Sequence, residues 1–324
     1  MPDITSRANI RHIAPFTAHC IGRQAPGQAR VAIDSVLEYD VDATSEFVFL
    51  IHATDMPGQT LIEESLLVEP PIPYRCYTDA ATGNRFLRLQ SEAGKLKVIY
   101  RAIVDRHVEP MAPDTPEVAV HDIPADVLHF VTPTRYCESD ELSADAQALF
   151  GAMPQGLQRV QAISHWVQNN ITYRLGSSDA STSAADVFTL RAGVCRDFAH
   201  LAIAFCKGLN IPARMVSGYA VFPDPPPDFH AVFEAYVGGR WIMFDPTGMT
   251  PVEHVVRIAT GRDAKDVAFA TIFGPARMAS MFPDTMVLGD LQSASPPTLP
   301  ARPARPARPA ELARAVSSPG SVSC

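Results

Sequence analysis

The sequence predicts an α+β protein in which a β-rich N-terminal region precedes a domain of helices packed on antiparallel strands. Three observations support this fold class. Short alternating apolar runs dominate residues 31–108, helical spacing follows the proline-rich residues 110–116, and strand-like runs return from Ala213. A chain of this length suggests about two domains. The predicted division is a β-rich domain at 1–125, an α+β domain at 126–290 and a tail at 291–324.

The N-terminal region is predicted to be an antiparallel β-sandwich. Its apolar runs are short, partly alternating and separated by turn residues, which is typical of strands. The sequence Thr82-Gly83-Asn84 favours a tight turn before one of them. The strands predicted from these runs cover residues 45–52, 63–69, 85–90 and 95–104.

Helical spacing of apolar residues defines the next region. Residues 145–150 and 156–170 are predicted helices, since their apolar positions fit a helical period better than a strand period. A third helix begins near Cys195 and stops before Asn210-Ile-Pro212, because proline cannot continue a helix. The thiol of Cys195 is therefore expected at a helix N-terminus.

Strands follow at residues 213–222, 230–237 and 241–245, and the first two are separated by a stiff proline-rich loop at 223–228. Gly238-Gly239 between apolar strands is a strong hairpin signal. If both glycines occupy the turn, Val237 faces Arg240 and Val232 faces Asp245. His230 and Asp245 are then diagonal neighbours on one sheet face, whereas a slip of one residue would separate them.

These positions predict a nucleophile, a base and an orienting carboxylate. A helix N-terminus and a neighbouring imidazolium both favour the thiolate, so Cys195 is the predicted nucleophile for an amide or ester carbonyl. His230 would protonate the leaving amine, and Asp245 would hold its ring in the productive tautomer. The Cys195 backbone N–H is one expected oxyanion donor. The second is Tyr173 or the cluster Gln168-Asn169-Asn170.

Simpler explanations compete with this prediction. A lone cysteine at a helix start is usually a small buried apolar residue, and Cys206 fits that description. Asp197 and His200 are expected to cap or hydrogen-bond locally, with Asp197 kept as a supporting-residue candidate. A metal site would draw on Cys195, His200, His230 and His254. Because Cys195 and His200 do not share a helix face, no metal site is predicted. No cofactor is predicted either.

Composition and charge exclude several partners. A net charge of −8 without a Lys/Arg stripe argues against nucleic acid. The N-terminus lacks an apolar signal core and no run reaches the ~18 apolar residues of a membrane span, so we expect a cytoplasmic protein with no membrane partner. The six scattered cysteines are expected to be reduced. The tail, with Ala301-Arg-Pro repeated three times, is predicted to be disordered, and no pattern predicts an oligomeric state.

At these residues the sequence resembles the transglutaminase-like superfamily, specifically its bacterial cysteine proteases. The resemblance covers residues 130–275 and implies a papain-like core in which Cys195, His230 and Asp245 are nucleophile, general acid/base and its partner. Residues before it resemble the β-rich region of bacterial relatives. One departure is Val232, where relatives often carry tryptophan. The motifs that carry the resemblance are Thr182-Ser-Ala-Ala-Asp186, Gly193-Val-Cys-Arg-Asp-Phe-Ala-His-Leu-Ala202, Gly208-Leu-Asn-Ile-Pro-Ala-Arg214, Ser217-Gly-Tyr219, His230-Ala231 and Phe244-Asp-Pro-Thr247.

Three functions are therefore open. The leading hypothesis is thiol-dependent hydrolysis of an amide in a peptide or protein, with that substrate as the expected partner. Transfer of the same acyl group to an amine would use the same thioester and differ only in what resolves it. A binding module that has kept the fold without turnover belongs to another class. The presence of all three triad residues favours the enzymes.

Overall fold

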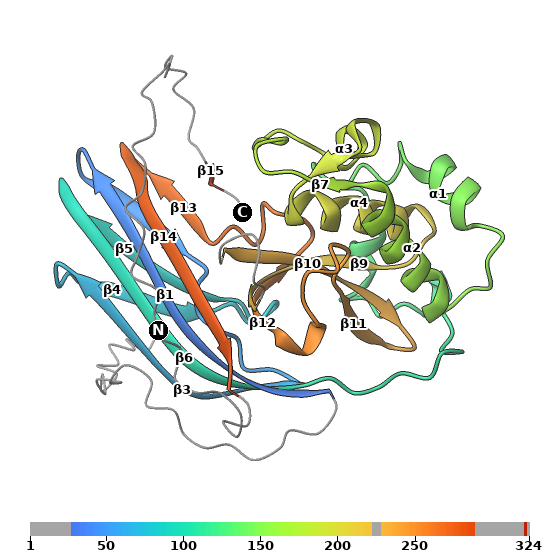
Figure 1. The fold of residues 1–324 in the computed structure, drawn as a ribbon, viewed down its shortest axis with the longest axis horizontal. Helices are drawn as coiled ribbons and strands as arrows, with labels where there is room; N and C mark the ends of the chain where they lie inside the picture. The colour runs from blue at the N-terminus through green and yellow to red at the C-terminus, as the bar shows by residue number, and fades with distance from the viewer. Residues whose placement is uncertain (1–26, 222–227, 289–320, 323–324) are drawn as a thin grey trace, which may run out of the picture.

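The computed structural model describes residues 27–221, 228–288 and 321–322. Figure 1 shows long twisted strands in one half of the molecule and helices against a smaller sheet in the other half. This arrangement confirms the predicted α+β class with a β-rich region before the core domain. Most of the predicted proline-rich loop and nearly all of the predicted disordered tail lie outside the described residues.

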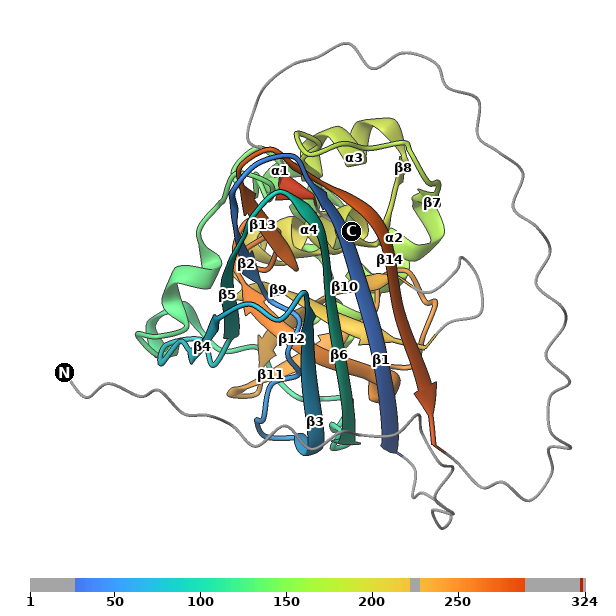
Figure 2. The ribbon, with the colours of Figure 1, turned by 90° about the vertical axis from the view of Figure 1, so that its left-hand side faces the viewer.

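The N-terminal half is built from two antiparallel sheets. Figure 2 shows the four long strands of the first sheet side by side, in the order β14-β1-β6-β3. Buried and partly exposed residues alternate along β1 and β6, because one face of this sheet covers a core. The first sheet comprises β1 (Gln28–Val41), β3 (Gln59–Glu69), β6 (Gly94–His107) and β14 (Ala276–Val287).

The second sheet of this half has the order β15-β13-β2-β5-β4. Its side chains meet those of the first sheet in the core, where the ring of Tyr39 lies 5.2 Å from that of Phe47. The predicted strands near residues 45, 63, 85 and 95 correspond to β2, β3, β5 and β6. The second sheet comprises β2 (Ser45–Phe49), β4 (Tyr74–Thr78), β5 (Arg85–Ser91), β13 (Ala270–Phe273) and β15 (Ser321–Val322).

Strands β13 and β14 differ from the predicted domain boundaries. The sequence prediction placed residues 270–290 in the core domain, but β14 pairs with β1 from Val31↔Val287 to Val41↔Ala276, and β13 pairs with β2. The chain thus returns to the N-terminal sheets after completing the core domain. No local pattern signals a pairing between strands more than 200 residues apart, so the sequence did not predict it.

The core domain packs helix α4 against a sheet of order β11-β10-β9-β12, and three further helices pack against α4. Helix α4 is its centre, since every residue from Cys195 to Lys207 is buried. The ring of Phe205 on α4 lies 5.4 Å from that of Trp166 and 5.6 Å from that of Phe150. The helices are α1 (Ser143–Phe150), α2 (Leu157–Asn170), α3 (Ala184–Leu190) and α4 (Cys195–Gly208), and the strands are β9 (Ala213–Ala220), β10 (Phe229–Val237), β11 (Arg240–Phe244) and β12 (Val255–Gly261).

Short elements complete the core domain. Helix α3 was not predicted, although Ser183 and Asp186 form a reciprocal capping box at its start. Strand β12 was not predicted either. Among the described residues, no helix is both long enough and apolar enough to cross a bilayer. The remaining elements are η1 (Val120–Asp122), η2 (Leu128–Val131), η3 (Val252–His254), β7 (Thr172–Tyr173) and β8 (Ala192–Gly193).

The hairpin between β10 and β11 has the predicted register. Val237 pairs with Arg240, and the pairing continues to Phe233↔Phe244. Gly238 and Gly239 have φ values of 60° and 79°, the left-handed conformation that a two-residue hairpin turn requires and that glycine adopts without strain. This register determines where His230 lies relative to the residue that follows β11.

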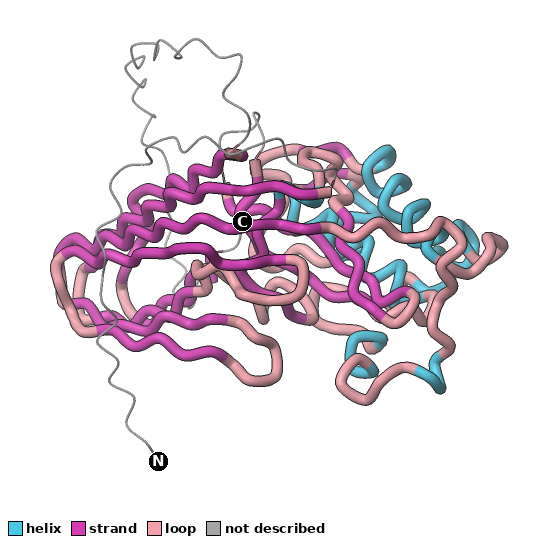
Figure 3. Tube along the Cα trace, turned by 90° about the horizontal axis from the view of Figure 1, so that it is seen from below, coloured by secondary structure: helices cyan, strands magenta, loops and turns pink. Residues whose placement is uncertain are grey.

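Side-chain amides join the two halves of the molecule. The amide of Gln59 accepts from the N–H of Arg257 at 2.8 Å and donates to its carbonyl at 2.9 Å. Asn84 makes the same pair of bonds with Thr260, both at 2.9 Å. Each amide thus makes the two backbone hydrogen bonds that a neighbouring strand would make along the outer edge of β12. Figure 3 shows the sandwich strands running up to the helical half, and these bonds make one continuous unit of the two.

Candidate active site

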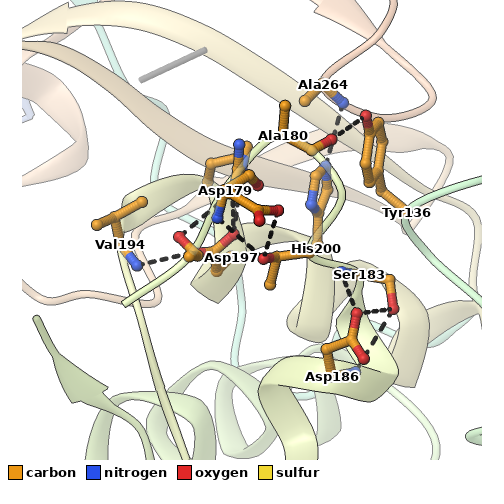
Figure 4. Close-up of polar contacts among 12 residues, drawn as sticks. Tyr136, Asp179, Ala180, Ser183, Asp186, Val194, Asp197, His200 and Ala264 are labelled. Atoms are coloured by element: carbon orange, nitrogen blue, oxygen red, sulfur yellow. Dashed lines mark hydrogen bonds and ion pairs between the residues drawn. The ribbon is translucent and has the colours of Figure 1, made fainter. Parts of the chain in front are cut away.

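The start of α4 places Cys195 at the positive end of a helix. Val194 is extended, and its carbonyl accepts the first helical hydrogen bonds, from Asp197 and Phe198. The Asp197 carboxylate in turn accepts from the Val194 N–H at 2.8 Å, which Figure 4 shows. Because Cys195 is the first helical residue, the helix dipole favours an anion at its position.

Asp197 also makes contacts that constrain the residues around it. The Arg196 guanidinium donates to Asp197 Oδ1 at 2.8 and 3.0 Å, and to the carbonyl of Asp179 at 2.8 Å. A Cβ at Gly193 would lie 2.6 Å from the Cβ of Asp197, so this position requires glycine. Asp197, predicted as a supporting residue, is therefore placed to hold the helix start and the adjacent loop.

His230 and Asp245 meet as the hairpin register requires. His230 lies on β10 and Asp245 follows β11, and His230 Nε2 is 3.1 Å from Asp245 Oδ2. The other carboxylate oxygen accepts from the backbone N–H and the hydroxyl of Thr247, at 2.9 and 2.7 Å. The N–H of Thr250 donates to Oδ2 at 3.2 Å. The carboxylate is thus oriented from two sides, and the contribution of Thr250 was not predicted.

The pKa values of the pair reflect this contact. Burial alone would lower the pKa of His230, but hydrogen bonds to Asp245 and to the side chain of Cys195 raise it to about 10. Burial raises the pKa of Asp245, but His230 and Thr247 outweigh burial, so that its pKa is lowered. Since Nε2 faces the carboxylate, Nδ1 is the ring nitrogen available to the thiol. The imidazolium is favoured wherever Asp245 is charged.

Tyr173 lies on the other side of Cys195. Strand β7 pairs in parallel with β8 so that Tyr173 is opposite Gly193, two residues before the thiol. The phenol forms hydrogen bonds with the backbone and the side chain of Cys195, and its pKa is raised by burial first and then by the charge of Cys195. Its ring lies 5.9 Å from that of Phe198, which supports it from α4.

The alternative oxyanion donors point elsewhere. The Gln168 amide lies against Gly248, where a Cβ would overlap it. Asn170 donates to the carbonyl of Trp166 at 2.8 Å, and Asn169 is an exposed residue near the end of α2. Of the side chains named from the sequence as a second donor, Tyr173 is the one hydrogen-bonded to Cys195.

His200 is a buried structural histidine. Its Nε2 accepts from the N–H of Ala264 at 3.1 Å, and its ring stacks on Tyr136 at 5.2 Å, as Figure 4 shows. Burial, and secondly the charge of Arg196, lower its pKa to about 3, so His200 is neutral at pH 7. Across the described residues no three His, Cys, Asp or Glu side chains form a group that could hold a metal.

The comparisons with known proteins agree with this fold. Residues 145–246 match the family described as the transglutaminase-like superfamily, and residues 29–126 match the bacterial transglutaminase N-terminal domain. A crystal structure from Cytophaga hutchinsonii, named a putative cysteine protease, is 43% identical with a TM-score of 0.76. It covers 81% of this chain, and this chain covers 91% of it. The protein belongs to the transglutaminase-like superfamily.

Curated relatives match a shorter part of the chain. Uncharacterized protein ML0607 of Mycobacterium leprae is 33% identical over 117 residues, which are 34% of this chain and 42% of the relative. Uncharacterized protein Rv2569c of Mycobacterium tuberculosis is 35% identical over 116 residues, 31% of this chain and 37% of the relative. The chain thus spans about two fifths of the length of these relatives.

Proposed function

We propose that this protein cleaves an amide bond in a peptide or protein through a thioester on Cys195. The observation that carries the proposal is the His230 imidazole, which contacts Asp245 through Nε2 at 3.1 Å and is also hydrogen-bonded to the Cys195 side chain. A nucleophile, a base and an orienting group in that order form the arrangement that thiol catalysis requires. The name of the Cytophaga hutchinsonii relative supports the same class.

The proposed reaction has two stages. Cys195 Sγ attacks the amide carbonyl carbon, and the resulting oxyanion accepts hydrogen bonds from the Cys195 N–H and the Tyr173 hydroxyl. The C–N bond then breaks, and His230 gives its proton to the leaving amine, which leaves a thioester. Water attacks the thioester carbonyl while His230 takes its proton, and the acid and the free thiol are released. Asp245 keeps the ring oriented throughout.

Transfer to an amine is the second candidate. An amine in place of water would resolve the same thioester and form a new amide, and the superfamily takes its name from that reaction. The side chains around Cys195 serve both outcomes equally. A non-catalytic binding role is the alternative of another class. The cytoplasmic location and the absence of nucleic-acid and membrane partners stay predictions.

The test is Cys195→Ala assayed on a peptide library with and without added amine. We expect the wild-type protein to release new amino termini or incorporate the amine, and the variant to do neither. Cys76→Ala is the matched control, since Cys76 is an exposed thiol on β4 and its loss should change nothing. Amidase or transfer activity that survives Cys195→Ala would contradict the mechanism.

Alkylation offers an independent check. Iodoacetamide at about pH 6 reacts with thiolates, so an activated Cys195 should be modified faster than the exposed Cys76. Peptide mapping by mass spectrometry identifies the modified site. Equal or slower modification of Cys195 would argue against an activated nucleophile.

A further inference from the structure

A loop at residues 174–179 runs alongside the residue that carries the proposed nucleophile. The parallel pair of β7 and β8 leads into it, and the N–H of its first residue donates to the Gly193 carbonyl at 2.9 Å. At the far end the Arg196 guanidinium donates to the carbonyl of the last residue at 2.8 Å. Gly193 and Arg196 lie on either side of Cys195 in the chain, so the loop follows the backbone past the thiol-bearing residue.

Hydrogen bonds hold this loop in one conformation. Its anchor Arg196 is buried and pairs with Asp197. The Arg174 carbonyl accepts from the N–H and the hydroxyl of Ser177, at 3.3 and 2.7 Å, which closes a tight turn. Gly176 has a φ of 75°, the conformation that the third position of a type II turn requires. The loop backbone is therefore fixed by contacts at both ends and by the turn between them.

Leu175 occupies the corner of this turn, and its side chain is 65% exposed. Single exposed leucines are common on protein surfaces and need no special explanation. Leu175 differs in its position, because it follows Tyr173 by two residues. If the register of β7 and β8 is continued by two residues, Leu175 reaches the level of Cys195. A fixed turn thus presents an apolar side chain to solvent beside the nucleophile.

The neighbouring groups indicate which half of a substrate Leu175 would meet. In the proposed reaction His230 gives its proton to the leaving nitrogen, so the amine half lies on the side of β10. Leu175 belongs to the loop of Tyr173, which approaches Cys195 from β7, in a different sheet. The acyl half, which stays bound to the thiol after the amine leaves, is therefore the half on the side of Leu175.

We propose that Leu175 is a specificity-determining residue that selects substrates with an apolar side chain in the acyl half, within two residues of the scissile carbonyl. Contact between two apolar side chains removes both from water, which favours such a substrate over a polar one of the same shape. The turn is already ordered, so binding need not order the backbone at this position. The proposal rests on the proposed function, because it assigns the acyl side of the same thioester reaction.

A substrate series tests the selectivity. Peptide amides with leucine or asparagine at either of the two positions before the scissile bond differ mainly in polarity, because both side chains branch at the same atom. For the wild-type protein we expect kcat/KM for leucine to exceed that for asparagine about tenfold at one of these positions. Leu175→Ser should bring this ratio close to one.

Leu149→Ser is the matched control. Leu149 is another exposed leucine, 41% exposed on α1. Helix α1 packs beside Gly208 at the opposite end of α4 from Cys195. The variant should therefore keep the wild-type preference for leucine, and circular dichroism confirms that both variants are folded.

A second measurement does not depend on turnover. Peptidyl chloromethyl ketones present the acyl half of a substrate to a thiolate, which displaces chloride from the methylene carbon and forms a thioether. We compare the rates at which the acetyl-dileucyl and acetyl-diasparaginyl ketones alkylate Cys195, with peptide mapping to identify the site. The quotient of the two rates should be about ten in the wild type and in Leu149→Ser, and close to one in Leu175→Ser.

The two measurements separate the two claims. A quotient that falls in Leu175→Ser while the wild-type protein neither cleaves an amide nor incorporates an amine would contradict the proposed function and support an apolar subsite at Leu175. A quotient that is close to one in the wild type, or unchanged in Leu175→Ser, overturns the Leu175 proposal, whatever the amidase assay shows. Ketones that leave Cys195 unmodified would contradict both claims, because the thiol would then accept no acyl half.

Discussion

The imidazole Nε2 of His230 lies 3.1 Å from Oδ2 of Asp245, although the two residues belong to different segments of a hairpin. The contact depends on a turn of two glycines, because a turn one residue longer or shorter would place one side chain on the opposite sheet face. The same imidazole is hydrogen-bonded to the Cys195 side chain. One hairpin turn therefore positions His230 and Asp245, and the start of α4 positions Cys195.

Asp245→Asn should lower kcat on the order of 10²- to 10⁴-fold, because the neutral amide neither stabilises the imidazolium nor selects its tautomer. KM should change little, since Asp245 lies behind the imidazole. Steady-state kinetics on the best library peptide measures both constants. Thr247→Val, which removes the hydroxyl bonded to Oδ1 but keeps the charge, should have a smaller effect. Equal losses in the two variants would contradict an electrostatic role for Asp245.

Tyr173→Phe should lower kcat by roughly 10²- to 10³-fold, the cost of removing one oxyanion donor. The phenylalanine keeps the ring beside Phe198 and removes only the hydroxyl bonded to Cys195. Stability should therefore be nearly unchanged, which thermal unfolding checks. A wild-type kcat in the variant would show that the second donor is another group.

His200→Gln should make stability less sensitive to acid. The folded-state pKa of His200 is about 3 and its ordinary value is 6.5, so the unfolded chain binds a proton that the folded protein excludes between these pH values. Wild-type stability must therefore fall as pH drops below 6.5, by up to ~1.4 kcal/mol per pH unit from this group. Glutamine can still accept from the Ala264 N–H and does not titrate.

Urea unfolding between pH 7 and pH 4 measures this slope. His165→Gln on the exposed side of α2 is the control and should leave the slope unchanged. A slope in His200→Gln as steep as that of the wild type would show that other groups, such as the buried His52, whose pKa burial lowers to about 4, carry the acid sensitivity.

Gln59→Leu and Asn84→Leu should each destabilise the protein by ~1–3 kcal/mol, because the first leaves the buried N–H of Arg257 without a partner and the second leaves both backbone groups of Thr260 without one. The double variant should weaken the coupling between the sandwich and the core domain. Differential scanning calorimetry should then resolve two transitions in place of one. Gln90→Leu, at an exposed position of β5, should cost less than ~0.5 kcal/mol, and a similar loss there would refute the argument.

Local patterns predicted much of this fold. The apolar periods identified β2, β5, β6, α2 and α4, and the two glycines predicted the hairpin register. Helix α3 was missed because it has only seven residues, of which Ala184 and Val187 are the buried ones. Strand β12 was missed because its charged Arg257 interrupts the apolar run, and in the structure Arg257 is buried against Glu234.

The candidate site was likewise predicted only in part. Cys195, His230 and Asp245 could be named from the sequence because a helix start and a hairpin turn are local signals. The requirement for glycine at position 193 could not be predicted from the sequence, because it arises from the close approach of Asp197 in the folded structure.

The sequence by itself determined the class of fold, the helix that begins at Cys195 and the strand register that pairs His230 with Asp245. These depend on residue periodicity and turn conformation over a few neighbouring positions. Only the tertiary structure decided that β13 and β14 complete the N-terminal sheets and that Tyr173 reaches the thiol. Those contacts join segments that are distant along the chain. The free energy that selects them comes from packing and burial in the folded protein.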